Sequence, residues 1–129
     1  MIRSCLKFLL LIAAGTALAQ PYPSKPIRVI VPFSPGGPVD VVMRLLSPKM
    51  TEMLGQPLVI ENKTGAGGNL GVQQAARAPA DGYTVLATSS SFAVNPALTP
   101  DAGYNPEKDF IAVAVVASQI GRASCRERV

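Results

Sequence analysis

Residues 25–40, KPIRVIVPFSPGGPVD, hold the pattern that decides the fold. The apolar run 25–33 predicts a strand with both faces covered, as in the middle of a parallel sheet. The glycine pair at 36–37 predicts a turn directly after that strand. Pro38 suits the first position of a helix, and Asp40 falls in the first helical turn, where the helix dipole favours an acid. This stretch therefore predicts a strand, a tight glycine loop and a helix.

The same order of elements recurs along the chain. Apolar spacing and turn residues predict further elements at 39–54 (helix), 57–62 (strand), 70–78 (helix) and 83–89 (strand). Pro48 lies inside the first helix and predicts a kink or a break into two shorter helices. Strands that alternate with helices in this way indicate the α/β class, with a mostly parallel sheet flanked by helices.

The rest of the chain is less regular. Residues 90–109 are rich in Pro, Asn and Ser, with one helical turn expected around 92–98, and the apolar run 110–118 predicts a fourth strand. Residues 122–129 have no apolar period and crowd in three Arg, a Cys and a Glu. We expect this tail to be non-native or truncated, although a genuine polar C-terminus is the alternative. Residues 20–121 are then expected to form one partial α/β lobe.

The N-terminus has the pattern of a secretory signal peptide. Arg3 and Lys7 lie in a short basic region, an apolar run covers 8–14, and an Ala-Leu-Ala cleavage site at 17–19 precedes Gln20. The apolar run is too short to span a bilayer. We expect residues 1–19 to be removed and the mature chain to be exported, although a buried N-terminal helix is the alternative.

Charge and residue inventory exclude several classes of function. The chain has 12 basic and eight acidic residues, but between positions 20 and 121 there are seven of each. This balance does not support nucleic-acid binding, which needs a clustered basic face. The chain has no His, and its two cysteines lie in the end segments at Cys5 and Cys125. A His-dependent catalytic triad and a His/Cys zinc site are therefore excluded, and no cofactor is expected.

Two glycine loops follow predicted strands and open predicted helices, at 35–37 and 65–68. Both helix starts would lie at one edge of a parallel sheet, with N–H groups that favour anions. A phosphate-binding P-loop is absent, since no Gly-Lys-Ser/Thr sequence occurs. A dinucleotide frame starting at Gly65 would need glycine where Leu70 stands. Hydroxyl residues at 88–91 lie at the carboxyl end of the third strand. Together the three loops favour a small carboxylate as the ligand.

Other interpretations of these residues remain open. The glycines could serve only tight turns, and the serines could only cap a helix. Asp40 could be a plain helix-start residue or could contact a donor on the ligand, and Asn95, before a proline, is divided between turn chemistry and ligand contact. A serine hydrolase using one of the serines at 89–91 is a competing function, opposed by the missing His and the missing G-x-S-x-G elbow.

The successive motifs resemble a known family. The chain from about residue 22 to 118 is similar to the N-terminal third of the tripartite tricarboxylate transporter substrate-binding family, the Bug proteins. The stretches that carry the resemblance are YPSKPIRVIVPFSPGGPVD, LGQPLVIENKTGAGGNLG, ADGYTVLATSSSFAVNPAL and YNPEKDF. Several motifs agree in order and spacing, which makes the resemblance more specific than any single glycine loop.

The resemblance implies a non-enzymatic periplasmic receptor with two α/β lobes that close on a small organic carboxylate. Main-chain N–H groups, hydroxyls and waters would hold the ligand, and membrane permease subunits of the transporter would receive it. A carboxylate sensor for a signalling partner would use the same loops. The residues of the first lobe implied to bind the ligand are Phe33, Ser34, Pro35, Gly36, Gly37, Asp40, Ala66, Gly67, Gly68, Thr88, Ser89 and Asn95.

Length is the main departure from the family pattern. The second lobe and the strand that returns to the first lobe are missing from these 129 residues. Because a cleft receptor buries its ligand between two lobes, one lobe is expected to bind weakly. We therefore expect this chain to be part of a receptor.

Overall fold

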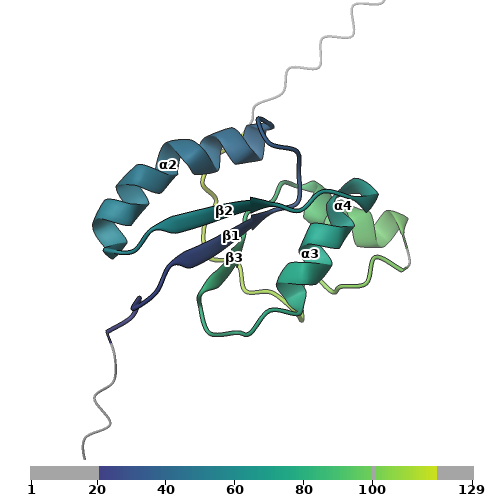
Figure 1. The fold of residues 1–129 in the computed structure, drawn as a ribbon. Helices are drawn as coiled ribbons and strands as arrows, with labels where there is room; N and C mark the ends of the chain where they lie inside the picture. The colour runs from purple at the N-terminus through teal and green to yellow at the C-terminus, as the bar shows by residue number, and fades with distance from the viewer. Residues whose placement is uncertain (1–20, 100, 119–129) are drawn as a thin grey trace, which may run out of the picture.

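The computed structural model describes residues 21–99 and 101–118. The expected signal peptide at 1–19 and the expected foreign tail at 122–129 lie outside the described residues. Within the described residues, three short strands form one parallel sheet and helices cover both of its faces (Figure 1). The predicted α/β class and the predicted parallel sheet are confirmed.

The central strand is β1, Ile27–Val31, as the apolar run predicts. β2, Leu58–Asn62, pairs with one edge of β1 and β3, Thr84–Leu86, with the other, so the strand order is β2-β1-β3. Both pairings are parallel. Since the three strands run in the same direction, their carboxyl ends and the loops that follow them lie at the same edge of the sheet.

Four helical segments connect and follow these strands. They are α2, Pro38–Leu54; a 3₁₀ turn, Ala66–Gly68; α3, Asn69–Ala76; and α4, Ser91–Leu98. In Figure 1, α2 lies on one face of the sheet, and α3 and α4 lie on the other side. The apolar side chains of β1 point alternately to the two faces. Val29 and Val31 pack with Met43 of α2, and Ile30, fully buried, points to the face that α3 covers.

Pro48 does not break α2. The helix runs without interruption from Pro38 to Leu54, so the predicted division into two shorter helices is wrong. Pro48 is exposed to solvent. Proline has no N–H, so one carbonyl in the preceding turn has no helical hydrogen-bond donor. Water can bind that carbonyl instead, which lowers the free-energy cost of a proline inside the helix. α2 ends at Gly55, which adopts a left-handed conformation with φ of 68°.

The fourth strand predicted at 110–118 is also wrong. This segment pairs with none of the strands among the described residues, and its apolar side chains are exposed, Ile111 by 92% and Val113 by 89%. An apolar run indicates a segment that favours burial, but a strand also needs a neighbouring strand for its N–H and C=O groups. At the start of the segment, Phe110 packs edge-on against Phe92 of α4.

No helix within residues 21–99 and 101–118 combines the length and the apolar character needed to cross a membrane.

Candidate functional site

Three loops meet the carboxyl edge of the sheet. The first follows β1 and opens α2, the second follows β2 and opens the 3₁₀ turn and α3, and the third follows β3 and opens α4. With strand order β2-β1-β3, the chain changes direction across the sheet between β1 and β3. Open α/β sheets bind ligands in the crevice at such a switch point. The topology therefore places all three predicted loops at the edge where binding is expected.

The first loop is a tight turn across Ser34-Pro35-Gly36-Gly37. The N–H of Gly37 donates to the carbonyl of Ser34 at 3.1 Å, and Gly36 has a φ of 80°. Proline in the second position and a positive φ at glycine in the third are the features of a type II turn. Ser34, Pro35 and Gly36 are exposed, and Gly37 leads directly into α2. The loop can therefore present its backbone to a ligand.

The start of α2 leaves backbone donors available. Pro38 occupies the first helical position and Asp40 the first turn, as predicted. The N–H groups of Val39 and Asp40 have no acceptor within the helix, because they belong to its first turn. Among the described residues, no side chain caps this end of the helix. Two N–H groups at the positive end of a 17-residue helix are thus suited to an anion.

The carboxylate of Asp40 is held by the protein itself. Asp40 is 1% exposed, and its Oδ2 accepts from the N–H of Gly36 and from Nε of Arg44, each at 2.8 Å. Its Oδ1 accepts from Nδ2 of Asn62 at 2.9 Å. The Arg44 hydrogen bond, followed by those from Gly36 and Asn62, holds the pKa of Asp40 well below its usual range. Asp40 is therefore an anion that fixes the first loop onto α2.

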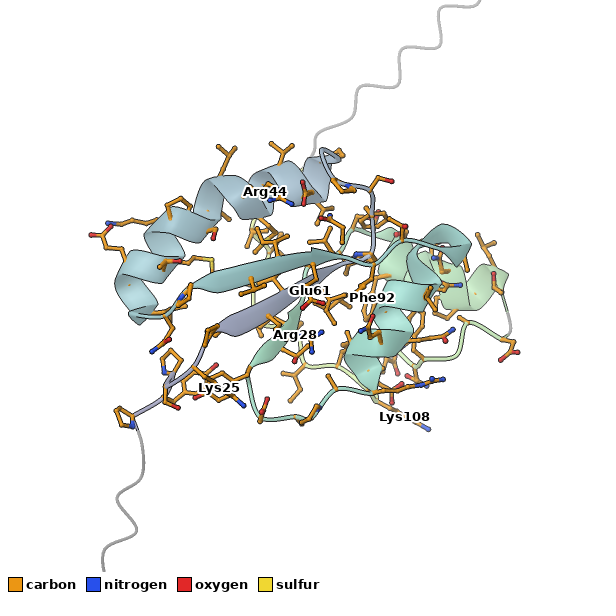
Figure 2. All side chains as sticks on the ribbon, in the orientation of Figure 1. Lys25, Arg28, Arg44, Glu61, Phe92 and Lys108 are labelled. Atoms are coloured by element: carbon orange, nitrogen blue, oxygen red, sulfur yellow. The ribbon has the colours of Figure 1, made fainter. Side chains whose placement is uncertain are left out.

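Asn62, the last residue of β2, completes this network. Its Nδ2 also donates to the carbonyl of Phe33 at 3.1 Å, and its Oδ1 accepts from Nη2 of Arg44 at 3.3 Å. Figure 2 shows Arg44 on the N-terminal half of α2, on the side of that helix nearer the sheet. The network thus ties together the end of β1, the start of α2 and the end of β2.

The second loop takes its shape from backbone conformation. Gly65, Ala66, Gly67 and Gly68 have φ values of 134°, 48°, 66° and 98°. Such a run of positive φ values is accessible to glycine, and Ala66 is the single residue with a side chain in it. A Cβ placed on Gly68 would lie 3.5 Å from the Phe33 ring and from Pro32. The second loop therefore packs directly against the first.

Asn95 of α4 fastens the second loop from its other side. Its Nδ2 donates to the carbonyl of Gly67 at 3.1 Å and to Oδ1 of Asn69 at 2.8 Å. Asn69 is 7% exposed and stands at the start of α3. The side chain of Asn95 thus holds the loop in place, and α4 becomes part of the same edge.

The third loop contributes hydroxyl groups. Oγ1 of Thr88 is buried and has no hydrogen-bond partner among the described residues. Ser89 is exposed, and its Oγ lies 3.1 Å from Oγ of Ser91. A buried hydroxyl without a partner is costly, because it has given up its hydrogen bonds to water. Thr88 therefore offers a donor at the loop edge.

The structure brings half of the twelve predicted site residues together in three pairs. Phe33 meets Gly68, Gly36 meets Asp40, and Asn95 meets Gly67. Sequence reasoning missed Arg44, Asn62 and Asn69. Two signals could have found the first two, since Arg44 lies four residues after Asp40 on a helix and Asn62 ends a strand at the same sheet edge.

The site carries no metal-binding group in the described part of the chain. There, no three His, Cys, Asp or Glu side chains gather closely enough to hold a metal ion.

Comparison with known proteins agrees with this architecture. The sequence model of the tripartite tricarboxylate transporter family receptor matches residues 42–122. The chain belongs to this family. The resemblance seen in the sequence motifs is therefore confirmed, and the family consists of solute-binding proteins.

Each relative in this receptor family is longer than the chain, so the chain matches only a part of it. Protein BugT of Bordetella pertussis is 44% identical over 105 residues, which cover 80% of this chain and 32% of BugT. The structure of the periplasmic binding protein BugD superposes with a TM-score of 0.67 at 45% identity, over 69% of this chain and 30% of BugD. The chain spans about a third of the length of the curated relatives it matches.

A ligand-bound relative matches to a similar extent. The structure of MatC from Rhodopseudomonas palustris with bound malate superposes with a TM-score of 0.63 at 41% identity. The match covers 69% of this chain and 31% of MatC. The fold of the described residues is therefore that of a part of these receptors.

Proposed function

We propose that the chain is the ligand-binding portion of one lobe of a periplasmic receptor that captures a small organic carboxylate. The observation that carries the proposal is the pairing of two helix starts at one sheet edge. The first turn of α2 and the 3₁₀ turn before α3 both present backbone N–H groups there, and among the described residues no side chain caps them. Such groups bind anions without a charged side chain.

The buried hydroxyl of Thr88 supports this proposal. It stands after β3, which pairs with β1, at the switch point of the sheet. A carboxylate has two oxygens that together accept several hydrogen bonds. One oxygen could accept from the first loop and the other from the second loop or from Thr88. Phe33, Ser34 and Ser89 would contribute the remaining wall of the cleft.

We also propose that the receptor is not an enzyme. Within these 129 residues there is no histidine that could activate the serines at 89–91. Within the described residues, the hydrogen-bond partner of Ser89 Oγ is another hydroxyl, that of Ser91. A hydroxyl is a weak nucleophile unless a base takes its proton. This arrangement suits hydrogen bonding to a ligand.

Malate is a suitable first probe, since MatC was solved with it bound. Thermal unfolding should be followed with increasing malate, with the neutral diamide of malate and with NaCl at matched ionic strength. Malate at about 100 times its dissociation constant would stabilise the folded chain by about 2.7 kcal/mol. Equal shifts with malate, with the diamide and with NaCl would contradict carboxylate binding. Other dicarboxylates with four to six carbons follow in the same assay.

We further propose that the bound carboxylate is delivered to the permease subunits of a tripartite tricarboxylate transporter. Deletion of the gene that encodes the receptor should then abolish uptake of the carboxylate. If deletion left uptake intact and abolished only carboxylate-induced gene expression, the receptor would serve sensing and the transport proposal would fail.

A further inference from the structure

We infer that Arg44 is a positioning residue that compensates the charge of Asp40 so that the first glycine loop can accept an anionic ligand. The inference rests on the proposed carboxylate-binding function. It concerns the repulsion between the carboxylate of Asp40 and an anionic ligand at that site.

The repulsion arises because a carboxylate stands beside the proposed anion site. Asp40 belongs to the first turn of α2, and its own N–H is one of the two donors expected to face the ligand. Its side chain accepts the N–H of Gly36, which fixes the turn. A buried negative charge at this place would repel a carboxylate ligand a few ångströms away.

Arg44 reduces the repulsion through its position one helical turn further along. Its Nε lies 2.8 Å from Oδ2 of Asp40, and the Asp40 side chain is 1% exposed, whereas that of Arg44 is 53% exposed. The guanidinium therefore neutralises the carboxylate from the solvent side. Since Nη2 also reaches Oδ1 of Asn62, the group is held in one orientation.

Asn62 directs this arrangement from the sheet. Its Nδ2 binds both Oδ1 of Asp40 and the carbonyl of Phe33, so the carboxylate and the loop backbone share one donor group. Three protein groups bind the oxygens of Asp40. The carboxylate stays charged, but together with Arg44 it forms an ion pair without net charge. The N–H groups of Val39 and Asp40 then supply the partial positive charge that attracts the ligand.

The test compares charge variants of the complete 129-residue chain. Succinate is titrated against ¹⁵N-labelled protein, and its dissociation constant is taken from the amide shifts of Val39 and Asp40. Arg44→Gln should weaken succinate binding about tenfold, because the Asp40 charge is left uncompensated. Lys49→Gln removes the same charge from an exposed position of α2 and should bind as the wild type does.

Two further variants separate charge compensation from a general structural effect. Adding Asp40→Asn to Arg44→Gln should make succinate binding tighter than in Arg44→Gln alone, since the repelling charge is gone. Arg44→Lys keeps the positive charge and should also bind within about threefold, although it loses the planar fork. This conservative variant tests the inference even if Arg44→Gln does not fold.

Several outcomes would overturn the inference. They are equal affinity of Arg44→Gln and Lys49→Gln, lack of rescue by Asp40→Asn, and an Arg44→Lys variant as weak as Arg44→Gln. Absence of any succinate-dependent shift in the wild type would overturn the proposed function together with this inference. Retained binding in Arg44→Gln would overturn the inference alone.

Discussion

The two glycine loops look alike in the sequence but are held by different forces. The first loop contains one residue with positive φ, Gly36, and is fixed by the side chains of Asp40, Arg44 and Asn62. The second loop contains four successive residues with positive φ, from Gly65 to Gly68. Its shape depends mainly on positive φ values, which glycine adopts more easily than any other residue. A strand-glycine-helix pattern therefore predicts where a loop lies but not what stabilises it.

The largest difference is expected when alanine replaces glycine. The double variant Gly67→Ala/Gly68→Ala should lower the free energy of unfolding by about 2–4 kcal/mol, because each left-handed alanine costs roughly 1–2 kcal/mol. Gly36→Ala in the first loop should cost about 1–2 kcal/mol, since a Cβ there meets open space. Urea unfolding measures both. If the double variant lost no more stability than Gly36→Ala, the left-handed backbone would not be what holds the second loop.

Gly71 tests how closely the two loops are packed. A Cβ on Gly71 would lie 2.6 Å from the carbonyl oxygen of Lys63 and 2.9 Å from Cα of Pro32, and neither backbone atom can move easily. Gly71→Ala should therefore destabilise the chain by about 1–3 kcal/mol. Gln74→Ala, at an exposed position of the same helix, should change stability by less than about 0.5 kcal/mol. If both variants unfolded at the same urea concentration, the close packing would be wrong.

The first loop should also respond to the loss of a charged side chain. Asp40→Asn removes the negative charge and one of the two carboxylate oxygens that accept from Gly36, Arg44 and Asn62. It should lower the midpoint of thermal unfolding by about 4–8 °C at pH 7. Differential scanning calorimetry measures the midpoint. An unchanged midpoint would show that the network does not stabilise the loop.

The same variant gives a pH dependence. Since the pKa of Asp40 is held below its usual value of about 4, its stabilising contribution is complete above that pH and is lost as pH falls toward the lowered pKa. The difference in midpoint between the wild type and Asp40→Asn should thus shrink below about pH 4. The pKa values of Glu61 and Asp81 are lowered too, but both variants retain these groups. A difference that grew on acidification would contradict the proposed charge state.

The smallest effect is expected at the exposed tip of the first loop. Ser34 is exposed and holds the turn through its backbone carbonyl, which alanine retains. Ser34→Ala should therefore change the free energy of unfolding by less than about 0.5 kcal/mol. A larger loss in urea unfolding would mean that the Ser34 hydroxyl supports the loop.

Local sequence patterns predict this fold well where neighbouring residues in the chain determine the structure. The glycine stop of α2 and Pro38 at the helix start are such cases. The error at 110–118 has a different origin, because a strand depends on a partner elsewhere in the chain. Pro48 was misjudged because its cost depends on exposure, which the helix orientation sets.

The candidate site shows the same limit. Sequence spacing indicates that both glycine loops reach one edge, since parallel strands impose it. It does not reveal that the carboxylate of Asp40 turns toward Arg44 and Asn62, because Asn62 is 22 residues away and meets it only through strand pairing. Contacts between distant elements therefore decide which polar residues hold the loops and which remain available to a ligand.

The central claim is that the two loops, despite their different support, act as one anion-binding edge. Titration of the ¹⁵N-labelled chain with succinate tests it most directly. The account predicts that two pairs of amides shift together with one dissociation constant. They are those of Val39 and Asp40, in the helical turn that follows the first loop, and those of Ala66 and Gly67 in the second loop. Shifts confined to one loop, or different constants for the two loops, would contradict it.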